Sequence, residues 1–288
     1  MNPVGLRQQL NALKCSTAAR ELEDVLGRHR QAASLEWVSD LLTREIDARR
    51  ERALHKRIAR AEFPEVTTLE SFDWGFNPKV PQTKILELAG LSFVRDNRIA
   101  LFLGATGLGK THLALALGVL AAKEGHRVFC ASIKKLIQLI EVAKMKNALD
   151  VLFKRLLSAK LWIIDDWGVV SMKRDTAEEV FDLFDRRKYS SAMILTSNRS
   201  VEEWGRVFPD PILASATIDR LFDRAEILVF EGASYRLKGR IQLPTVQPGD
   251  IESTPRELTR DFPEGPFSGW HIQAASAPSI EVKTSLGV

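Results

Sequence analysis

Residues 99–111, with the sequence IALFLGATGLGKT, decide the fold, because an apolar run leads directly into a glycine-rich loop. The loop satisfies the pattern GxxxxGK[ST], which binds nucleotide phosphates when it follows a strand and opens a helix. Its glycines permit a tight turn that brings backbone N–H groups onto a phosphate, and the following helix presents its positive end. The residues predicted to bind the nucleotide are Gly104, Ala105, Thr106, Gly107, Leu108, Gly109, Lys110, Thr111 and His112.

Two side chains of the loop and two carboxylates elsewhere in the sequence are the groups predicted to bind phosphate, bind Mg²⁺ and accept a proton. We expect Lys110 to reach the β- and γ-phosphates of ATP and the Thr111 hydroxyl to bind Mg²⁺. Asp165 and Asp166 directly follow the apolar run at 161–164. Asp165 is expected to hold Mg²⁺ through its water shell, and Asp166 to orient and deprotonate the attacking water. Taken alone, an Asp-Asp pair after a strand is as often a turn.

Short apolar runs alternate with helical stretches between about residues 70 and 240. This alternation predicts an α/β fold with a five-stranded parallel sheet, helices on both sides and strands buried on both faces. The expected strands are 99–103, 127–130, 161–165, 192–196 and 226–230. The expected helices are 110–124, 132–146, 175–189 and 211–224.

Two further polar residues are candidates for catalysis. If the strand at 192–196 lies between the two strands that carry the loop and the aspartates, Asn198 at its end sits beside the γ-phosphate. Alternatively, the Ser-Asn pair only ends the strand in a turn. Arg220, in a helical segment, can enter the site of a neighbouring subunit and neutralise charge in the transition state. The alternative is a surface ion pair with Asp223 or Glu226.

The chain divides into three parts by composition. Residues 1–66 are expected to form a small helical module, with helices at 17–31 and 34–62, and residues 67–240 to form the main domain. Residues 241–288 hold six of the twelve prolines and predict a flexible tail, in which 262–270 is an alternative partner-binding segment.

A basic stripe is predicted on the second N-terminal helix. At 100° per residue, four cations lie on one side of the helix, where they can follow the phosphates of DNA. The alternative is a solvated face whose cations pair with acidic residues of the same helix, Glu45 among them. The stripe consists of Arg49, Arg52, Lys56 and Arg60.

Several classes of protein are excluded. The net charge of +4 over 288 residues is small unless it is clustered, and two cysteines without a CxxC pair predict a reduced, cytoplasmic setting. The apolar run 113–122 is too short for the roughly 18 residues of a membrane span, so no membrane contact is expected. An Asn-Lys-x-Asp motif, which a GTPase would need, is absent.

Several strings together resemble the IstB family, the helper ATPases of insertion-sequence transposition. This family belongs to the AAA+ superfamily and is related to the DnaC-type helicase loaders. The resemblance covers about residues 5–240. The strings are Phe72-Asp73-Trp74, Phe93-Val94-Arg95-Asp96-Asn97, the loop with His112-Leu113-Ala114, Ile163-Ile164-Asp165-Asp166-Trp167-Gly168, Thr196-Ser197-Asn198-Arg199, Glu203-Trp204-Gly205, Ile218-Asp219-Arg220-Leu221 and Ser234-Tyr235-Arg236-Leu237-Lys238.

The resemblance implies an AAA+ ATPase that hydrolyses ATP as a homo-oligomer assembled on double-stranded DNA and that recruits and stimulates a transposase. It implies that the N-terminal helices contact DNA, that Arg220 is an arginine finger and that Arg236 is a possible second sensor. Phe222 stands where family members often carry histidine, and the tail exceeds the usual family length. The alternative function is a DnaC-like helicase loader, and a third is a scaffold that binds ATP without hydrolysing it.

Overall fold

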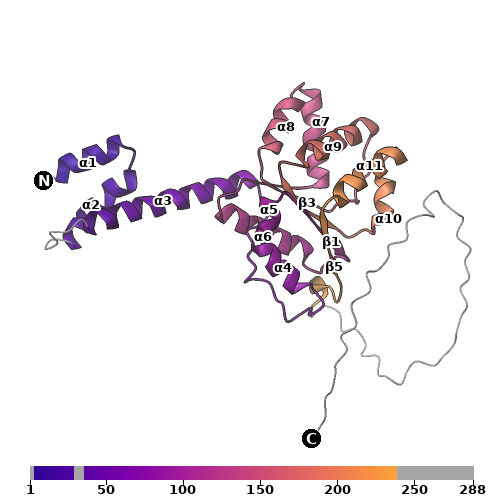
Figure 1. Cartoon of the computed structure of the whole chain (residues 1–288), viewed down its shortest axis with the longest axis horizontal. Coiled ribbons are helices and arrows are strands. Elements are labelled where there is room, and N and C mark those ends of the chain that lie inside the picture. Colours follow the sequence, from indigo (N-terminus) through magenta and orange to yellow (C-terminus); the bar gives the residue numbers. More distant parts are fainter. Residues whose placement is uncertain (1–2, 29–35, 239–288) are drawn as a thin grey trace, which may run out of the picture. The chain divides into compact units, whose positions relative to one another are not determined.

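The computed structural model describes residues 3–28 and 36–238 (Figure 1). All of the described residues belong to one compact unit by their internal contacts. The predicted tail at 241–288 lies outside the described residues, as do residues 29–35, which include the ends of both predicted N-terminal helices.

A five-stranded parallel sheet forms the centre of the domain, as the sequence predicted. Its order is β2-β3-β4-β1-β5, and all four strand pairs are parallel. β4 lies between β3 and β1, so the ends of these three strands meet at one edge of the sheet. The strands are β1 (Ile99–Gly104), β2 (Val128–Ser132), β3 (Leu161–Asp165), β4 (Ala192–Ser197) and β5 (Ala225–Phe230).

One expectation about the strands was wrong. The apolar composition of all five predicted burial on both faces, but Ile227 and Val229 of β5 are 41% and 55% exposed. Leu228 and Phe230, on the other face, are buried. β5 is one of the two edge strands, with a single neighbour in the sheet, and these two side chains face solvent.

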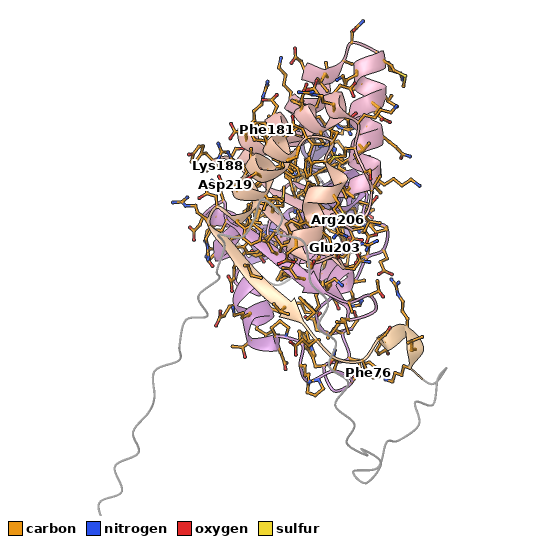
Figure 2. The ribbon with its side chains drawn as sticks, turned by 90° about the vertical axis from the view of Figure 1, so that its right-hand side faces the viewer. Phe76, Phe181, Lys188, Glu203, Arg206 and Asp219 are labelled. Atoms are coloured by element: carbon orange, nitrogen blue, oxygen red, sulfur yellow. The ribbon has the colours of Figure 1, made fainter. Side chains whose placement is uncertain are left out.

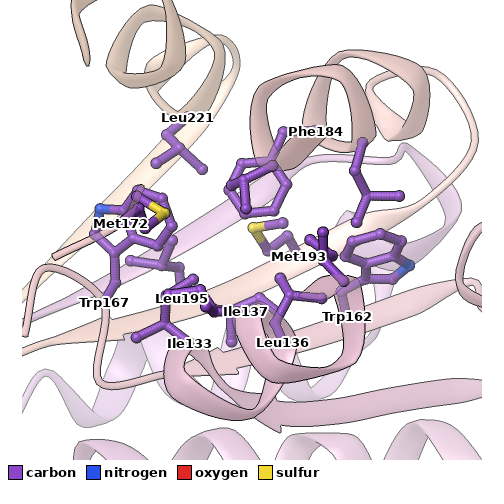
Figure 3. Close-up of a cluster of buried hydrophobic side chains, with 14 of the residues drawn as sticks. Ile133, Leu136, Ile137, Trp162, Trp167, Met172, Phe184, Met193, Leu195 and Leu221 are labelled. Atoms are coloured by element: carbon purple, nitrogen blue, oxygen red, sulfur yellow. The ribbon is translucent and has the colours of Figure 1, made fainter. Parts of the chain in front are cut away.

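Alternate residues of the strands supply two separate cores, one on each face of the sheet. On one face, Trp162, Met193 and Leu195 pack with four helices (Figure 3): α7 (Ile133–Met145), α8 (Leu149–Leu157), α9 (Arg174–Arg187) and α11 (Pro211–Phe222). On the other face, Phe102 and Ile163 pack with α4 (Gln82–Ala89), α5 (Ser92–Arg95), α6 (Lys110–Lys123) and the end of α3 (Glu36–Ala61). Helices therefore cover both faces, as predicted.

The four predicted helices of the main domain are confirmed to within two residues. They are α6 (Lys110–Lys123), α7 (Ile133–Met145), α9 (Arg174–Arg187) and α11 (Pro211–Phe222). Helices that the sequence reading did not identify are α4 (Gln82–Ala89), α5 (Ser92–Arg95), α8 (Leu149–Leu157) and α10 (Val201–Trp204), with short 3-10 turns η1 (Gly205–Val207) and η2 (Tyr235–Leu237). Among the described helices, none is both long and apolar enough to cross a membrane.

Three helices precede the main domain where two were expected: α1 (Pro3–Ala12), α2 (Ser16–Arg28) and α3 (Glu36–Ala61). α1, α2 and the first half of α3 share a small core that contains Leu22 and Leu41. The last turns of α3 pack on the main domain, where Ala61 is buried and Arg57 Nε donates to the carbonyl of Ala122 at 2.7 Å. α3 thus contributes to both cores, and the boundary at residue 66 stays a prediction.

Candidate active site

The glycine-rich loop joins β1 to α6, as predicted. Gly107 and Gly109 have φ values of 81° and 88°, which residues with a side chain rarely adopt. A Cβ atom at Gly107 would lie 2.0 Å from Ser234 Oγ, and one at Gly109 would lie 2.4 Å from the ring of Phe72. Both glycines are therefore required by the backbone conformation and by the close approach of other segments.

Lys110 lies inside the loop. Its ammonium group is buried and donates to the carbonyl oxygens of Gly104 and Ala105, each at 2.7 Å. Burial lowers the pKa of Lys110, and the nearby carboxylates of Asp165 and Asp166 oppose that effect. The ammonium charge thus lies inside the loop and close to both aspartates.

The structure brings the two predicted metal ligands together. Thr111, in the first turn of α6, donates from Oγ1 to Oδ1 of Asp165 at 2.8 Å. Asp165 ends β3, two strands away from β1 in the sheet. A hydroxyl and a carboxylate at this distance are hard oxygen ligands of the kind that Mg²⁺ prefers.

Asp166 lies beside this pair with an unusual backbone. Its φ is 59°, in the left-handed region, and its side chain lines the same pocket as Lys110. Burial, and then the charge of Asp165, raises the pKa of Asp166. The carboxylate is therefore more basic than a solvated aspartate, which suits a group that accepts a proton.

Asn198 follows β4 and lines the pocket. The preceding Ser197 hydroxyl donates to the carbonyl of Trp167 at 2.8 Å and accepts from the N–H of Arg199 at 3.1 Å. The turn expected under the alternative interpretation is thus present, and it aims Asn198 at the end of the sheet where the aspartates lie.

An open pocket of about 380 Å³ contains most of the predicted site. Its volume is in the range of small-molecule sites. Within it the structure gathers Thr106 to His112, both aspartates and Asn198. It also adds residues to which the sequence reading gave no role in the site: Glu65, Ser71, Phe72, Asp73, Phe76, Asn77, Thr196, Ala233 and Tyr235.

Most of the added residues come from two segments that are far apart in sequence and meet over the loop. The N–H of Tyr235 donates to the carbonyl of Gly107 at 2.8 Å, and Lys238 pairs with Asp73 at 2.8 Å. The rings of Phe76, which is labelled in Figure 2, and Tyr235 lie edge to face, with their centroids 5.0 Å apart. Segments 71–77 and 233–238 therefore form walls of the pocket.

His112 and Arg236 occupy the pocket as well. His112 Nε2 lies 3.2 Å from Ser71 Oγ, so its ring joins the 71–77 segment to the start of α6. Arg236 lines the pocket, and its charge lowers the pKa values of both Lys110 and Asp166. The string that suggested a second sensor thus places a cation near the acidic pair.

Arg220 does not join the pocket of its own chain. On α11 its Nε pairs with Asp185 at 2.6 Å, and its NH1 pairs with Asp219 at 3.0 Å. The alternative predicted from the sequence was a surface ion pair of Arg220 with Asp223 or Glu226. Arg220 does form surface ion pairs, but its partners are Asp185 and Asp219. Asp219 lies well apart from Phe76 in Figure 2.

The four cations of the predicted basic stripe have different surroundings, because among the described residues two are paired and two are not. Arg49 Nε pairs with Glu45 at 2.7 Å and Arg49 NH2 donates to the carbonyl of Lys14 at 3.0 Å, while Arg52 reaches Glu45, Ser16 and Thr17. These two arginines hold α2 and the turn before it against α3, which matches the alternative of local pairing. Lys56 and Arg60 are exposed, and over the described residues neither forms a hydrogen bond or ion pair. A free stripe of four cations is therefore not what the structure presents.

Comparison with known proteins gives a family. Residues 7–243 match the family model described as IstB-like ATP binding protein. Over 203 residues the chain is 40% identical to the "Insertion sequence IS21 putative ATP-binding protein" of Pseudomonas aeruginosa, which covers 70% of this chain and 77% of the relative. Over 235 residues it is 33% identical to the "Insertion sequence IS232 putative ATP-binding protein" of Bacillus thuringiensis subsp. berliner. This match covers 81% of this chain and 94% of the relative.

Solved structures agree on the fold. The replication initiator DnaA bound to AMPPCP and single-stranded DNA matches with a TM-score of 0.51 and 22% identity, over 64% of this chain and 58% of that one. A protein described as a DNA replication initiation factor matches with a TM-score of 0.50 and 23% identity, over 62% of this chain and 56% of that one. This chain spans between half and three fifths of each of these proteins and shares their α/β fold. The family match and the curated relatives together show that the chain belongs to the IstB-like ATP-binding proteins of insertion sequences.

Proposed function

We propose that this protein hydrolyses ATP as a homo-oligomer assembled on double-stranded DNA and that, in this state, it recruits and stimulates a transposase. The observation that carries the proposal is the convergence of Lys110, Asp165, Asp166 and Asn198 in one pocket. A protein that only bound ATP would have no need for a basic carboxylate beside the metal ligands.

The hydrolytic step follows from the positions of these groups. Lys110 and the N–H groups of the loop bind the phosphates, while Asn198 and Asp166 hold a water molecule against the γ-phosphate. Asp166 accepts the proton of this water as its oxygen bonds to phosphorus and the bond to the β-phosphate oxygen breaks. The products are ADP and inorganic phosphate.

Mg²⁺ fits the residues that are present. Thr111 Oγ1 and Asp165 Oδ1 would hold it, because they lie 2.8 Å apart and face the pocket. The ion would supply positive charge to the β- and γ-phosphate oxygens.

The oligomer completes the site in this proposal. Arg236 is the arginine in the pocket, whereas Arg220 lies on α11 with its side chain one third exposed. An arginine outside the pocket of its own chain can reach a phosphate only in a neighbouring subunit. We therefore assign Arg220 as the finger that acts on the next subunit's ATP.

For DNA, the supporting residues are fewer than the sequence suggested. Lys56 and Arg60, on the last two turns of α3, are the exposed members of the stripe whose charges have no partner among the described residues, whereas Arg49 and Arg52 are paired with Glu45. Arg49 and Arg52 act on DNA only through the position of the helices that they hold together. The transposase partner is inferred from the insertion-sequence relatives.

The proposal is tested by steady-state ATP hydrolysis at fixed salt with and without non-specific duplex DNA, alongside measurement of particle size. Lys110→Ala serves as the blank. Stimulation by duplex together with growth in particle size is the expected result. Turnover that ignores duplex would favour the helicase loader, and no turnover would leave an ATP-gated scaffold.

A further inference from the structure

A single buried hydroxyl joins both aspartates of the site. Thr196, on β4, is 1% exposed, and its Oγ1 accepts a hydrogen bond from the backbone N–H of Asp166 at 3.2 Å. The same Oγ1 donates to Oδ1 of Asp165 in a short hydrogen bond. One group therefore touches the side chain of the predicted metal ligand and the backbone of the predicted base.

The carboxylate of Asp165 is fixed from two sides. Its Oδ1 accepts from Thr196 and also from Thr111, whose Oγ1 lies 2.8 Å away. These hydroxyls come from two different elements, β4 and α6. Two donors on one oxygen hold the carboxylate in a single orientation, which a solvated side chain would not keep.

The backbone of Asp166 also depends on this contact. Its φ of 59° is unfavourable for a residue with a side chain, so neighbouring groups must hold it. Thr196 does so twice, because its hydroxyl accepts from the N–H of Asp166 and its carbonyl accepts from the N–H of Trp167 at 2.9 Å. This left-handed turn is what directs the Asp166 carboxylate into the pocket instead of along the strand.

From this geometry we infer that Thr196 is a positioning residue for catalysis: its hydroxyl orients the metal-binding carboxylate of Asp165 and holds Asp166 in the conformation that aims it at the attacking water. The inference rests on the proposed ATPase activity and names a residue that acts through two others. The hydroxyl itself transfers no proton.

Thr196→Val tests the inference because valine keeps the shape of threonine and removes both hydrogen bonds of the hydroxyl. We expect kcat to fall by about 10- to 100-fold, as a misplaced catalytic group does. The affinity for a fluorescent ATP analogue without metal should stay within about twofold. Thr196→Ser keeps the hydroxyl and should restore most of the lost turnover.

A second readout does not depend on activity. In the wild type, adding Mg²⁺ should tighten binding of the fluorescent ATP analogue, because Asp165 is held ready for the ion. In Thr196→Val this gain should shrink, and in Thr196→Ser it should return. Thr176→Val is the matched control: Thr176 is also 1% exposed but lies on α9, and this variant should keep both turnover and the Mg²⁺ gain.

The outcomes separate this inference from the proposed function. If the wild type hydrolyses no ATP, the proposed function fails. If the wild type is active and Thr196→Val keeps its turnover within twofold, or Thr196→Ser is no better than Thr196→Val, the positioning role is wrong. Equal losses in Thr196→Val and Thr176→Val would show that only core packing is affected.

Discussion

Glu45 is the residue on which the N-terminal helices depend most, and replacing it by alanine is the sharpest test of how they are held. Its side chain is 4% exposed and accepts from the N–H of Ala18 at 2.9 Å, from Arg49 and from Arg52. Ala18 is itself fully buried, so Glu45→Ala leaves its N–H without a partner. No other carboxylate among the described residues is buried to this degree.

The magnitude follows from these contacts. An orphaned buried N–H costs about 1–3 kcal/mol. Each half-exposed arginine pair contributes under about 1 kcal/mol. Glu45→Ala should therefore destabilise the packing of α2 on α3 by about 2–4 kcal/mol.

Amide hydrogen exchange at Ala18 is the direct assay, because the Glu45 carboxylate and the packing of α2 on α3 together protect this N–H. We expect it to accelerate by about 30-fold or more, since each 1.4 kcal/mol is a factor of ten. Glu51→Ala is the control: Glu51 is exposed, its partner His55 lies 3.8 Å away, and the change should stay under about 0.5 kcal/mol. Equal exchange in the two variants would refute the reasoning.

The same carboxylate predicts a pH dependence. Burial opposes ionisation of Glu45, but the hydrogen bonds from Ala18 and Arg49 hold its pKa below the ordinary value of 4.5. A lowered pKa in the folded state contributes stability above pH 4.5, and this contribution is lost as the pH falls through the folded-state pKa. The protection factor at Ala18, which removes the intrinsic pH dependence of amide exchange, should therefore fall below pH 4.5 in the wild type more than in Glu45→Gln.

Three further predictions concern the nucleotide and DNA. Gly107→Ala should weaken ATP binding by more than tenfold in a fluorescent-nucleotide titration, because its Cβ would lie 2.0 Å from Ser234 Oγ at a φ of 81°; unchanged affinity would contradict the loop geometry. Replacing Lys56 and Arg60 together by alanine should weaken duplex binding at every sequence and reduce the slope of log K against log salt by about 2, and an unchanged slope would remove them from the interface. Asp166→Asn should keep ATP binding and lose at least about 100-fold in turnover, whereas retained turnover would show that another group accepts the proton.

Local patterns in the sequence were sufficient for the sheet and the loop. The five strands are continuous apolar runs, and the GxxxxGK[ST] string has one structural context, so both were placed to within two residues. The position of β4 between β3 and β1 could be anticipated only because a P-loop sheet was already indicated. β5 shows the limit of this reasoning, since its composition does not reveal that it is an edge strand.

Contacts between distant segments were the part that sequence reasoning missed. The pairs Tyr235 with Gly107 and Lys238 with Asp73 join residues more than 100 positions apart, and no periodic pattern marks them. Thr196 was identified as a strand residue and as part of a family string but was given no role in the site, because a threonine at the end of a strand usually carries no more than β-propensity.

The prediction of a free basic stripe on α3 was wrong for a related reason. Helical spacing correctly places Arg49 and Arg52 on one side of α3, but it does not show that α2 and a buried Glu45 occupy that side. A carboxylate one turn before an arginine can form an exposed pair or a buried anchor, and burial by another helix decides between them.

The central claim is that Arg220 completes the active site of a neighbouring subunit. Mixing two inactive variants tests this claim most directly. Lys110→Ala lacks the phosphate-binding lysine but keeps Arg220, whereas Arg220→Ala keeps a complete pocket and lacks the finger. If Arg220 acts on the neighbouring subunit's ATP, mixed oligomers on duplex DNA should recover a substantial fraction of wild-type hydrolysis, because some pockets then face an intact arginine. A mixture as inactive as its two components, in particles of wild-type size, would contradict a site completed between subunits.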